Sequence, residues 1–197
     1  MVIGDRQIET FQLINHQGAE RIRFSLAEFT GEKVAINPIK VCVQSLDGFS
    51  RDVADRRRKT MAIHVKVNGD IEGEILFILS RRSAVRFARE MLKDHAGFNI
   101  HLRPLEQSAL CEVANILSNA YILAFADCTA LSWKVTVPHL CTNLNKFFEL
   151  SGRLFNLSSV VLSAEMHFLE KDIQCTFALI ARKESFGRLL EGLGGMH

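Results

Sequence analysis

An internal repeat constrains the fold of this chain more than any other feature of its sequence. Residues of the same type recur at offsets of 100 to 102 residues: Asn15 and Asn115, Pro38 and Pro138, Ser83 and Ser185. The same order of predicted helices and strands accompanies these pairs in both parts of the sequence. A near-constant offset combined with a repeated element order is typical of a duplicated unit. We therefore predict two related halves, over residues 5–95 and 104–193.

Hydrophobic periodicity and turn residues predict the elements of the first half. We expect, in order, a long helix over residues 6–29, a strand over 33–43, a polar loop or short helix over 45–59, strands over 60–67 and 71–79, and a helix over 82–92. Asn68-Gly69-Asp70 is a strong hairpin signal between the two central strands. Pro38 lies inside the first strand, and because proline cannot donate a ladder hydrogen bond, it favours an edge position.

The second half repeats this plan. We expect a helix from Pro104 to about residue 126, a strand over 131–140, a polar or helical connection over 142–156, two strands around Lys171-Asp172, and a helix over 183–193. Each half alone presents too little core for a two-sided sheet. We therefore predict one α+β domain over residues 1–197, in which both halves share a mainly antiparallel sheet with the long helices packed on it.

Composition and charge exclude several broad classes of protein. The 197 residues are 48% hydrophobic and carry a formal net charge of +2, which is too small for a protein that works by neutralising nucleic-acid phosphates. The five cysteines form an odd set without a CxxC pair, as expected of reduced thiols in a cytoplasmic protein. The sequence has neither a signal-peptide core nor a continuous apolar stretch of 18 residues, so we expect no membrane partner.

Other motifs that carry chemistry are missing from the sequence. The seven histidines show no HxxxH or HExxH spacing, so we predict no metal site. Without GxxxxGK[ST], GxGxxG or GxSxG, the chain lacks the local signatures of nucleotide hydrolysis, dinucleotide binding and α/β-hydrolase chemistry. The basic run Arg56-Arg57-Arg58-Lys59 is either a solvated loop or a patch that steers an acidic partner, and the sequence leaves both readings open.

A line of polar side chains distinguishes the second long helix. Ser108, Glu112, Asn115 and Asn119 follow one another at spacings of 4, 3 and 4 residues, which places them within about 60° on a helical wheel. Apolar residues such as Leu105, Val113 and Leu117 occupy a different face, which we expect to be the core side. A carboxylate and a carboxamide thus point out of the core together, as either a solvated face or a site.

The constellation Ser108-x3-Glu112-x2-Asn115-x22-Pro138 resembles the active-site signature of the CheC/CheX/FliY phosphatases, which act on the phosphorylated receiver CheY. The run from Glu106 to Leu117 is similar to the family's motif helix over its whole length, and the duplicated architecture resembles CheC over nearly the entire chain. The sequence contains no added flagellar-switch domain, which favours CheC over FliY, and the element order favours CheC over CheX.

The resemblance implies a role for each motif residue. Asn115 would position water for attack on an aspartyl phosphate, and Glu112 would dock on a receiver lysine. Ser108 and Asn119 would support them, while Pro138 would shape the neighbouring strand. The resemblance also implies that Mg²⁺ belongs to the partner receiver and that this chain binds no cofactor of its own.

Two further expectations concern the partners and the first half. A non-catalytic scaffold that binds a receiver or a CheD-type deamidase is the alternative function, and a homodimer is a further possible partner. Aligning Asn15 with Asn115 puts Gln12 where Glu112 stands and Ile8 where Ser108 stands, so the first helix would carry a degenerate second site at Gln12 and Asn15.

Overall fold

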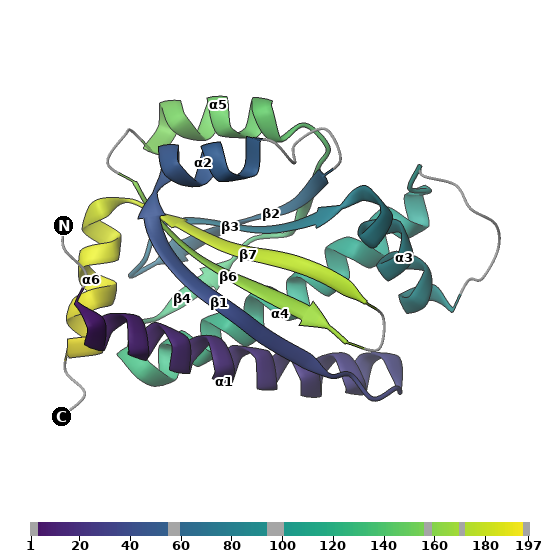
Figure 1. Ribbon diagram of the computed structural model, residues 1–197, viewed down its shortest axis with the longest axis horizontal. Coiled ribbons are helices and arrows are strands. Elements are labelled where there is room, and N and C mark those ends of the chain that lie inside the picture. The colour runs from purple at the N-terminus through teal and green to yellow at the C-terminus, as the bar shows by residue number, and fades with distance from the viewer. Residues whose placement is uncertain (1–3, 55–59, 94–100, 156–158, 170–171, 195–197) are drawn as a thin grey trace.

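The computed structural model describes residues 4–54, 60–93, 101–155, 159–169 and 172–194. One curled sheet forms its middle layer (Figure 1). Two long helices, α1 (Asp5–Thr30) and α4 (Pro104–Thr129), cover one face of the sheet. Two short helices, α2 (Leu46–Ala54) and α5 (Leu144–Phe155), lie together on the other face. Within the described residues, the polar segments expected to be loops or short helices are therefore largely helical.

The sheet is antiparallel throughout its described pairings, which confirms the predicted α+β class. Its strands are β1 (Ile36–Ser45), β2 (Thr60–Gly69), β3 (Gly73–Ser80), β4 (Trp133–Val135), β5 (His139–Cys141), β6 (Val160–Phe168) and β7 (Ile173–Ala181). They follow the order β1-β6-β7-β3-β2-β4, and β5 also pairs with β2. If β1 is exchanged with β4, β2 with β6 and β3 with β7, the same strand order results, read from the other edge of the sheet. A duplication requires this symmetry, although the duplication itself stays a prediction.

The two prolines of the repeat, Pro38 and Pro138, lie where an outer strand is interrupted. β1 is an edge strand, as Pro38 predicts, and its register against β6 shifts between Pro38 and Lys40. The single strand expected over 131–140 is instead two short strands, and the buried Pro138 lies between them. Proline offers no N–H to a neighbouring strand, which is why neither outer strand forms an unbroken ladder.

Two hydrophobic cores fill the spaces on either side of the sheet. Along β3, Ile75, Phe77 and Leu79 join the core beneath the long helices. The alternate residues Leu76 and Ile78 join the core beneath the short helices. This two-sided burial explains why β3 is a continuous apolar run rather than an alternating one.

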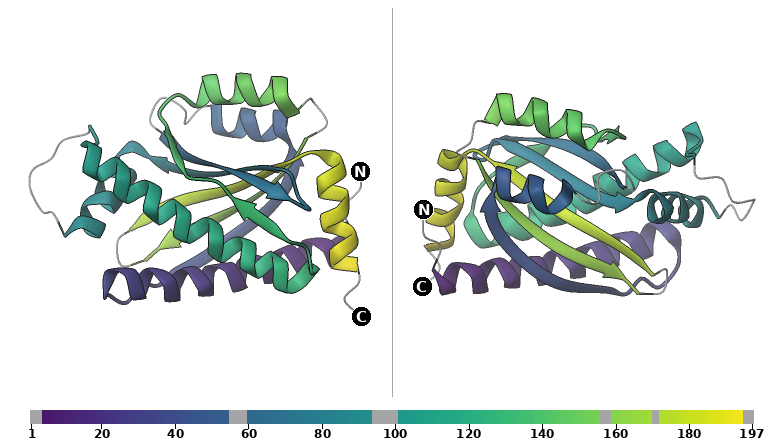
Figure 2. Two further views of the ribbon diagram at one scale, coloured as in Figure 1. Left: turned by 180° about the vertical axis from the view of Figure 1, so that it is seen from behind. Right: turned by 45° about the horizontal axis from the view of Figure 1, so that its top comes forward.

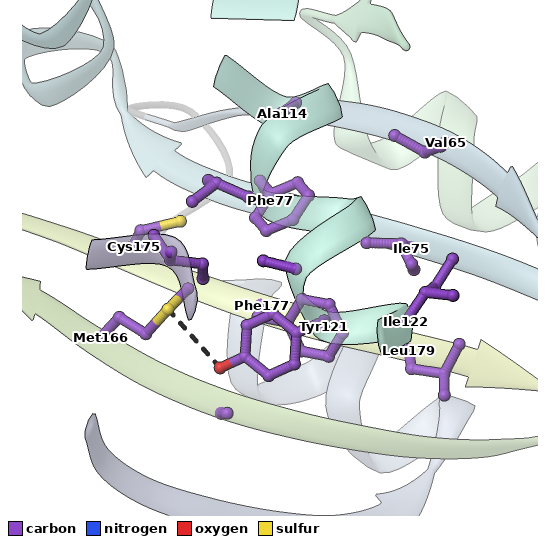
Figure 3. Close-up of a cluster of buried hydrophobic side chains, with 14 of the residues drawn as sticks. Val65, Ile75, Phe77, Ala114, Tyr121, Ile122, Met166, Cys175, Phe177 and Leu179 are labelled. Atoms are coloured by element: carbon purple, nitrogen blue, oxygen red, sulfur yellow. Dashed lines mark hydrogen bonds between the residues drawn. The ribbon is translucent and has the colours of Figure 1, made fainter. Parts of the chain in front are cut away.

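The two long helices pack directly against each other and run in opposite directions (Figure 2). A Cβ atom on Gly18 of α1 would come within 3.0 Å of the Tyr121 ring on α4, so a glycine permits this close approach. The Tyr121 ring stacks on Phe177 with the ring centroids 4.0 Å apart (Figure 3). Its hydroxyl donates to the Asn15 carboxamide oxygen and lies 3.5 Å from the Met166 sulfur. Burial raises the pKa of Tyr121, so the hydroxyl stays protonated.

The helices α3 (Arg81–Leu92) and α6 (Lys183–Gly194) complete the long-helix side of the fold. The start of α4 is joined to α3 by the fully buried Glu106, which accepts hydrogen bonds from Arg89 Nε at 2.9 Å and from the Arg103 backbone N–H at 2.7 Å. Burial by itself raises the pKa of Glu106, but the bonds from the Arg103 backbone and from the Arg89 and Arg103 side chains outweigh it and hold the pKa below its usual value.

By length and composition, α4 is apolar enough to span a membrane, and 56% of its most apolar window is buried in the fold. That burial accounts for its apolar composition, because the helix packs on both α1 and the sheet. One residue expected on its core side is not there. Leu105 is 64% exposed, since it lies in the first turn and faces away from the sheet.

Candidate functional site

The polar line predicted on the second long helix lies on the outer surface of α4. Ser108, Glu112 and Asn119 are exposed and Asn115 is half-buried. The buried residues of α4, such as Val113, Leu117 and Tyr121, occupy the opposite side of the helix. The sheet and α1 therefore hold the line in a rigid orientation toward solvent, because the apolar face of α4 cannot rotate away from its core.

The Asn115 carboxamide is oriented by the residue one turn later. Asn119 Nδ2 donates to Asn115 Oδ1 at 3.1 Å and to the Asn115 backbone oxygen at 2.8 Å. Because Oδ1 accepts this bond, the amide group of Asn115 is directed away from Asn119, where its two N–H donors can meet another molecule. The oxygen still has a second lone pair, so the carboxamide can both donate and accept.

Glu112 and Ser108 differ in how they are held. Within the described part of the chain, the Glu112 carboxylate makes no ion pair or hydrogen bond, which makes it available to a cation on a partner. The Ser108 hydroxyl donates to the Pro104 carbonyl at 3.1 Å, one turn back in the same helix. The Ser108 hydroxyl thus donates to the backbone of its own helix rather than to the Glu112 carboxylate.

A groove lies between α1 and α4 beside Asn115, with a volume of about 490 Å³. Asn115, Asn119 and Leu123 belong to its α4 wall, and Phe24 and Ser25 belong to its α1 wall. Phe24 is 64% exposed and Leu123 is 51% exposed, so both rims are apolar and open to solvent. The sequence analysis did not identify this groove, although Phe24 stands out as an apolar residue outside the buried stripe of α1.

Charged side chains around the groove are paired with each other. Arg21 lines the groove and forms an ion pair with Asp127 of α4. Arg23 donates to Glu20 at 2.8 Å, and its guanidinium carbon lies 4.1 Å from the Phe24 ring centroid. The charges of Arg21 and Arg23 are therefore balanced by Asp127 and Glu20. The Arg23 guanidinium also makes a cation–π contact with the Phe24 ring.

A larger depression of about 1030 Å³ lies elsewhere, between α2, α3 and the strands β6 and β7. Its lining includes Asp52, Glu165 and Thr176. None of the predicted site residues lines it. The polar line and this depression are therefore separate surfaces.

Pro138 lies between the short strands β4 and β5, and both of these strands contact the motif helix α4. Leu140, two residues after Pro138, packs against the core that includes buried residues of α4. Cys111 of α4 packs against the same core. Burial raises the pKa of the Cys111 thiol, and a hydrogen bond with the Leu140 backbone opposes this effect. Pro138 is thus close to the motif helix through the strand it interrupts.

The predicted second site at Gln12 and Asn15 is not formed, because the alignment behind it is wrong by one residue. α1 and α4 match at an offset of 99 residues, since they begin at Asp5 and Pro104 and end at Thr30 and Thr129. In this register Asn15 takes the place of Ala114, and both residues are buried.

Under the predicted duplication, the same register identifies the counterparts of Glu112 and Asn115 on the first helix. They are Leu13 and His16, both exposed. Neither an anion nor a carboxamide therefore stands at the equivalent positions. Asn15 accepts a buried hydrogen bond from Tyr121 instead, while Gln12 is exposed beside it in the sequence.

No group of three or more metal-ligating side chains occurs among the residues that the structure describes. The basic run Arg56–Lys59 lies outside the described residues.

Comparisons with known proteins identify relatives of the sequence and of the fold. No family model matches the sequence. The chain is 26% identical over 162 residues to the CheY-P phosphatase CheC of Bacillus subtilis, which covers 80% of this chain and 76% of that protein. The fold is similar to that of Thermotoga maritima FliY, with a TM-score of 0.74 at 14% identity over 100% of both chains. It is also similar to a chain of the CheX–CheY–BeF3–Mg²⁺ complex of Borrelia burgdorferi, with a TM-score of 0.56 at 14% identity over 85% of this chain and 96% of that one.

Proposed function

Because the chain belongs to the CheC/CheX/FliY family, we propose that it hydrolyses the aspartyl phosphate of a CheY-type receiver through Glu112 and Asn115. The observation that carries the proposal is the outward-facing carboxamide of Asn115, held by Asn119, with the exposed Glu112 three residues before it. The homology to CheY-P phosphatases supports the reaction, and the α4 geometry supports the choice of residues.

Hydrolysis of an aspartyl phosphate needs few catalytic groups from the phosphatase. An aspartyl phosphate is a reactive mixed anhydride, so catalysis needs chiefly a water molecule aligned with the bond that breaks. Water attacks phosphorus, the bond between phosphorus and the aspartate oxygen breaks, and the products are inorganic phosphate and a free carboxylate. Asn115 accepts a hydrogen bond from the attacking water through Oδ1 and donates to a phosphoryl oxygen through Nδ2.

Glu112 acts in binding rather than in bond breaking. Its exposed carboxylate docks on a lysine of the receiver through a charge-assisted hydrogen bond, which sets the register of α4 against the receiver. Mg²⁺ supplies charge neutralisation at the phosphoryl group and belongs to the receiver's own site. Neither Glu112 nor Asn115 forms a covalent bond with the phosphoryl group.

The test is the decay of a ³²P-labelled phospho-receiver from the same organism, with no addition, with the wild-type protein and with Asn115→Ala. We expect the wild-type protein to accelerate the decay and Asn115→Ala to lose about a hundredfold of that acceleration, because water is no longer positioned. The fold should survive, since Asn115 lies at the surface of α4.

Two outcomes would contradict the proposal. Full activity of Asn115→Ala would remove the assigned catalytic residue. Measurable binding of the phospho-receiver without any acceleration by the wild-type protein would favour a scaffold over a phosphatase. Glu112→Gln supplies the companion variant, for which we expect a higher KM with little change in kcat, because the lost charge acts in docking.

A further inference from the structure

The groove between α1 and α4 is not used by the catalytic chemistry, yet it opens directly beside Asn115. We propose that this groove holds an apolar side chain that the receiver presents next to its phosphorylated aspartate. The inference rests on the proposed function, and it adds the first long helix to the surface that binds the receiver. Phe24 and Leu123 would then determine the affinity for the receiver, while Asn115 determines the rate.

Exposed apolar side chains on both rims indicate a surface that another protein covers. Phe24 of α1 and Leu123 of α4 are 64% and 51% exposed, and both line the same groove. Their neighbours Ile116 and Ala120 line it as well. Apolar surface concentrated in a concavity is typical of a site for a protein partner, whereas single exposed apolar residues need no such explanation.

The groove is already shaped for an occupant. Arg23 lies over the Phe24 ring and donates to Glu20, so these contacts restrict the orientation of the Phe24 side chain at the rim of the groove. Arg21 is neutralised by Asp127. Because these charges are paired, the groove favours an apolar side chain over a charged one. A volume of about 490 Å³ accommodates one or a few such side chains.

The groove is continuous with the proposed phosphatase site, which is why we assign its occupant to the receiver. Asn115 and Asn119 form part of the groove wall. A receiver whose phosphoryl group reaches Asn115 must therefore lie over the groove as well. Water that remained in an apolar groove beneath the receiver would cost free energy, which an apolar side chain from the receiver avoids.

The test uses the intact protein and a CheY-type receiver from the same organism, loaded with BeF3⁻ and Mg²⁺ for binding and with phosphate for turnover. We expect Phe24→Ser and Leu123→Ser each to raise the Kd and the KM about tenfold while kcat at saturating receiver stays within twofold. Ser25→Trp, which fills the groove without removing an apolar rim, should raise the Kd as well. Leu13→Ser is the matched control: Leu13 is a half-exposed apolar residue of α1 outside the groove lining, so its substitution should change neither constant.

The outcomes separate this inference from the proposed function. Unchanged Kd and KM in folded Phe24→Ser and Leu123→Ser proteins would overturn the groove inference, even if the phosphatase activity is real. Loss of a dimer of this chain in those variants, with receiver binding intact, would assign the groove to a second copy and would also overturn it. If the wild-type protein binds the receiver without hydrolysis, the phosphatase proposal fails, and the Kd values still decide about the groove.

Discussion

At the scale of single residues, the same amino-acid type serves two different purposes on the two long helices. Asn115 is half-buried at the surface, and its carboxamide is oriented by Asn119. Asn15 is buried between the helices and satisfies the Tyr121 hydroxyl. A buried carboxamide that accepts a hydrogen bond from a buried hydroxyl is a structural group, whereas a half-buried carboxamide whose N–H groups face solvent can bind a partner.

The hydrogen bond from Asn119 predicts how the Asn115 carboxamide, which we propose to be catalytic, responds to substitution. In Asn119→Asp the carboxylate cannot donate, so the Asn115 amide should turn its N–H groups inward and present its oxygen to the phosphoryl group. We expect kcat to fall about tenfold, because a misoriented hydrogen bond costs about 1–1.5 kcal/mol. Stopped-flow measurement of receiver dephosphorylation gives kcat and KM separately.

Two companion variants identify the cause. Asn119→Leu removes the donor without adding a charge, so it should lower kcat in the same direction as Asn119→Asp. Ser108→Ala should stay within twofold of the wild-type kcat, since the Ser108 hydroxyl donates to its own helix. An Asn119→Leu protein with the wild-type kcat would show that Asn115 needs no orienting partner.

At the scale of elements, the motif helix depends on how its first turn is anchored. Glu106 is fully buried between α3 and α4 and binds Arg89, Arg103 and a backbone N–H. These bonds satisfy donors at the start of α4 and join α4 to α3. The same helix carries the polar line, which begins two residues later at Ser108, so the anchor contributes to the orientation of the proposed site.

The lowered pKa of Glu106 predicts acid-sensitive stability. A carboxyl group whose pKa is lower in the folded state stabilises the fold above its unfolded pKa of about 4.3, and this contribution is lost as the pH falls through the folded pKa. We expect Glu106→Gln to lower the free energy of unfolding by about 1–3 kcal/mol at pH 7. The difference from the wild-type protein should shrink below about pH 4.

Urea unfolding at pH 7 and at low pH measures this difference. Glu112→Gln provides the control, because Glu112 is an exposed carboxylate on the same helix and should change the free energy of unfolding by no more than about 0.5 kcal/mol at either pH. A difference for Glu106→Gln that stayed constant with pH would mean that its ionisation does not contribute.

At the scale of the whole molecule, the two halves are interleaved rather than side by side. The first-half strand β1 pairs with β6, and the second-half strands β4 and β5 pair with β2. The central pair, β3 with β7, also joins one half to the other. The only described strand pairing within either half is its own hairpin, β2 with β3 or β6 with β7.

This interleaving predicts that neither half folds alone. If the chain is divided between α3 and α4, each fragment keeps one hairpin and loses the partners of its outer strand, and an isolated hairpin is at best marginally stable. We expect each fragment to lack cooperative unfolding by circular dichroism and an equimolar mixture to recover it. A fragment that unfolds cooperatively on its own would contradict the shared sheet.

The sequence by itself determined the order of the long helices, the hairpins and the last helix of each half, the α+β class, the edge position of β1 and the outward line on α4. Each of these follows from local signals, namely periodicity, turn residues and the missing N–H of Pro38, which act within a few residues. The role proposed for Glu112 and Asn115 rests on a motif resemblance rather than on periodicity, since a polar line alone does not separate a site from a solvated face.

Only the tertiary structure decided which positions of α1 and α4 are equivalent, what Asn15 does, and that a groove opens beside Asn115. The offset of 99 residues depends on which side of each helix the sheet buries, and one residue rotates a side chain by about 100° around the helix. The groove and the Glu106 anchor join residues from different helices. Their formation is determined by packing between distant segments, which no local pattern in the sequence specifies.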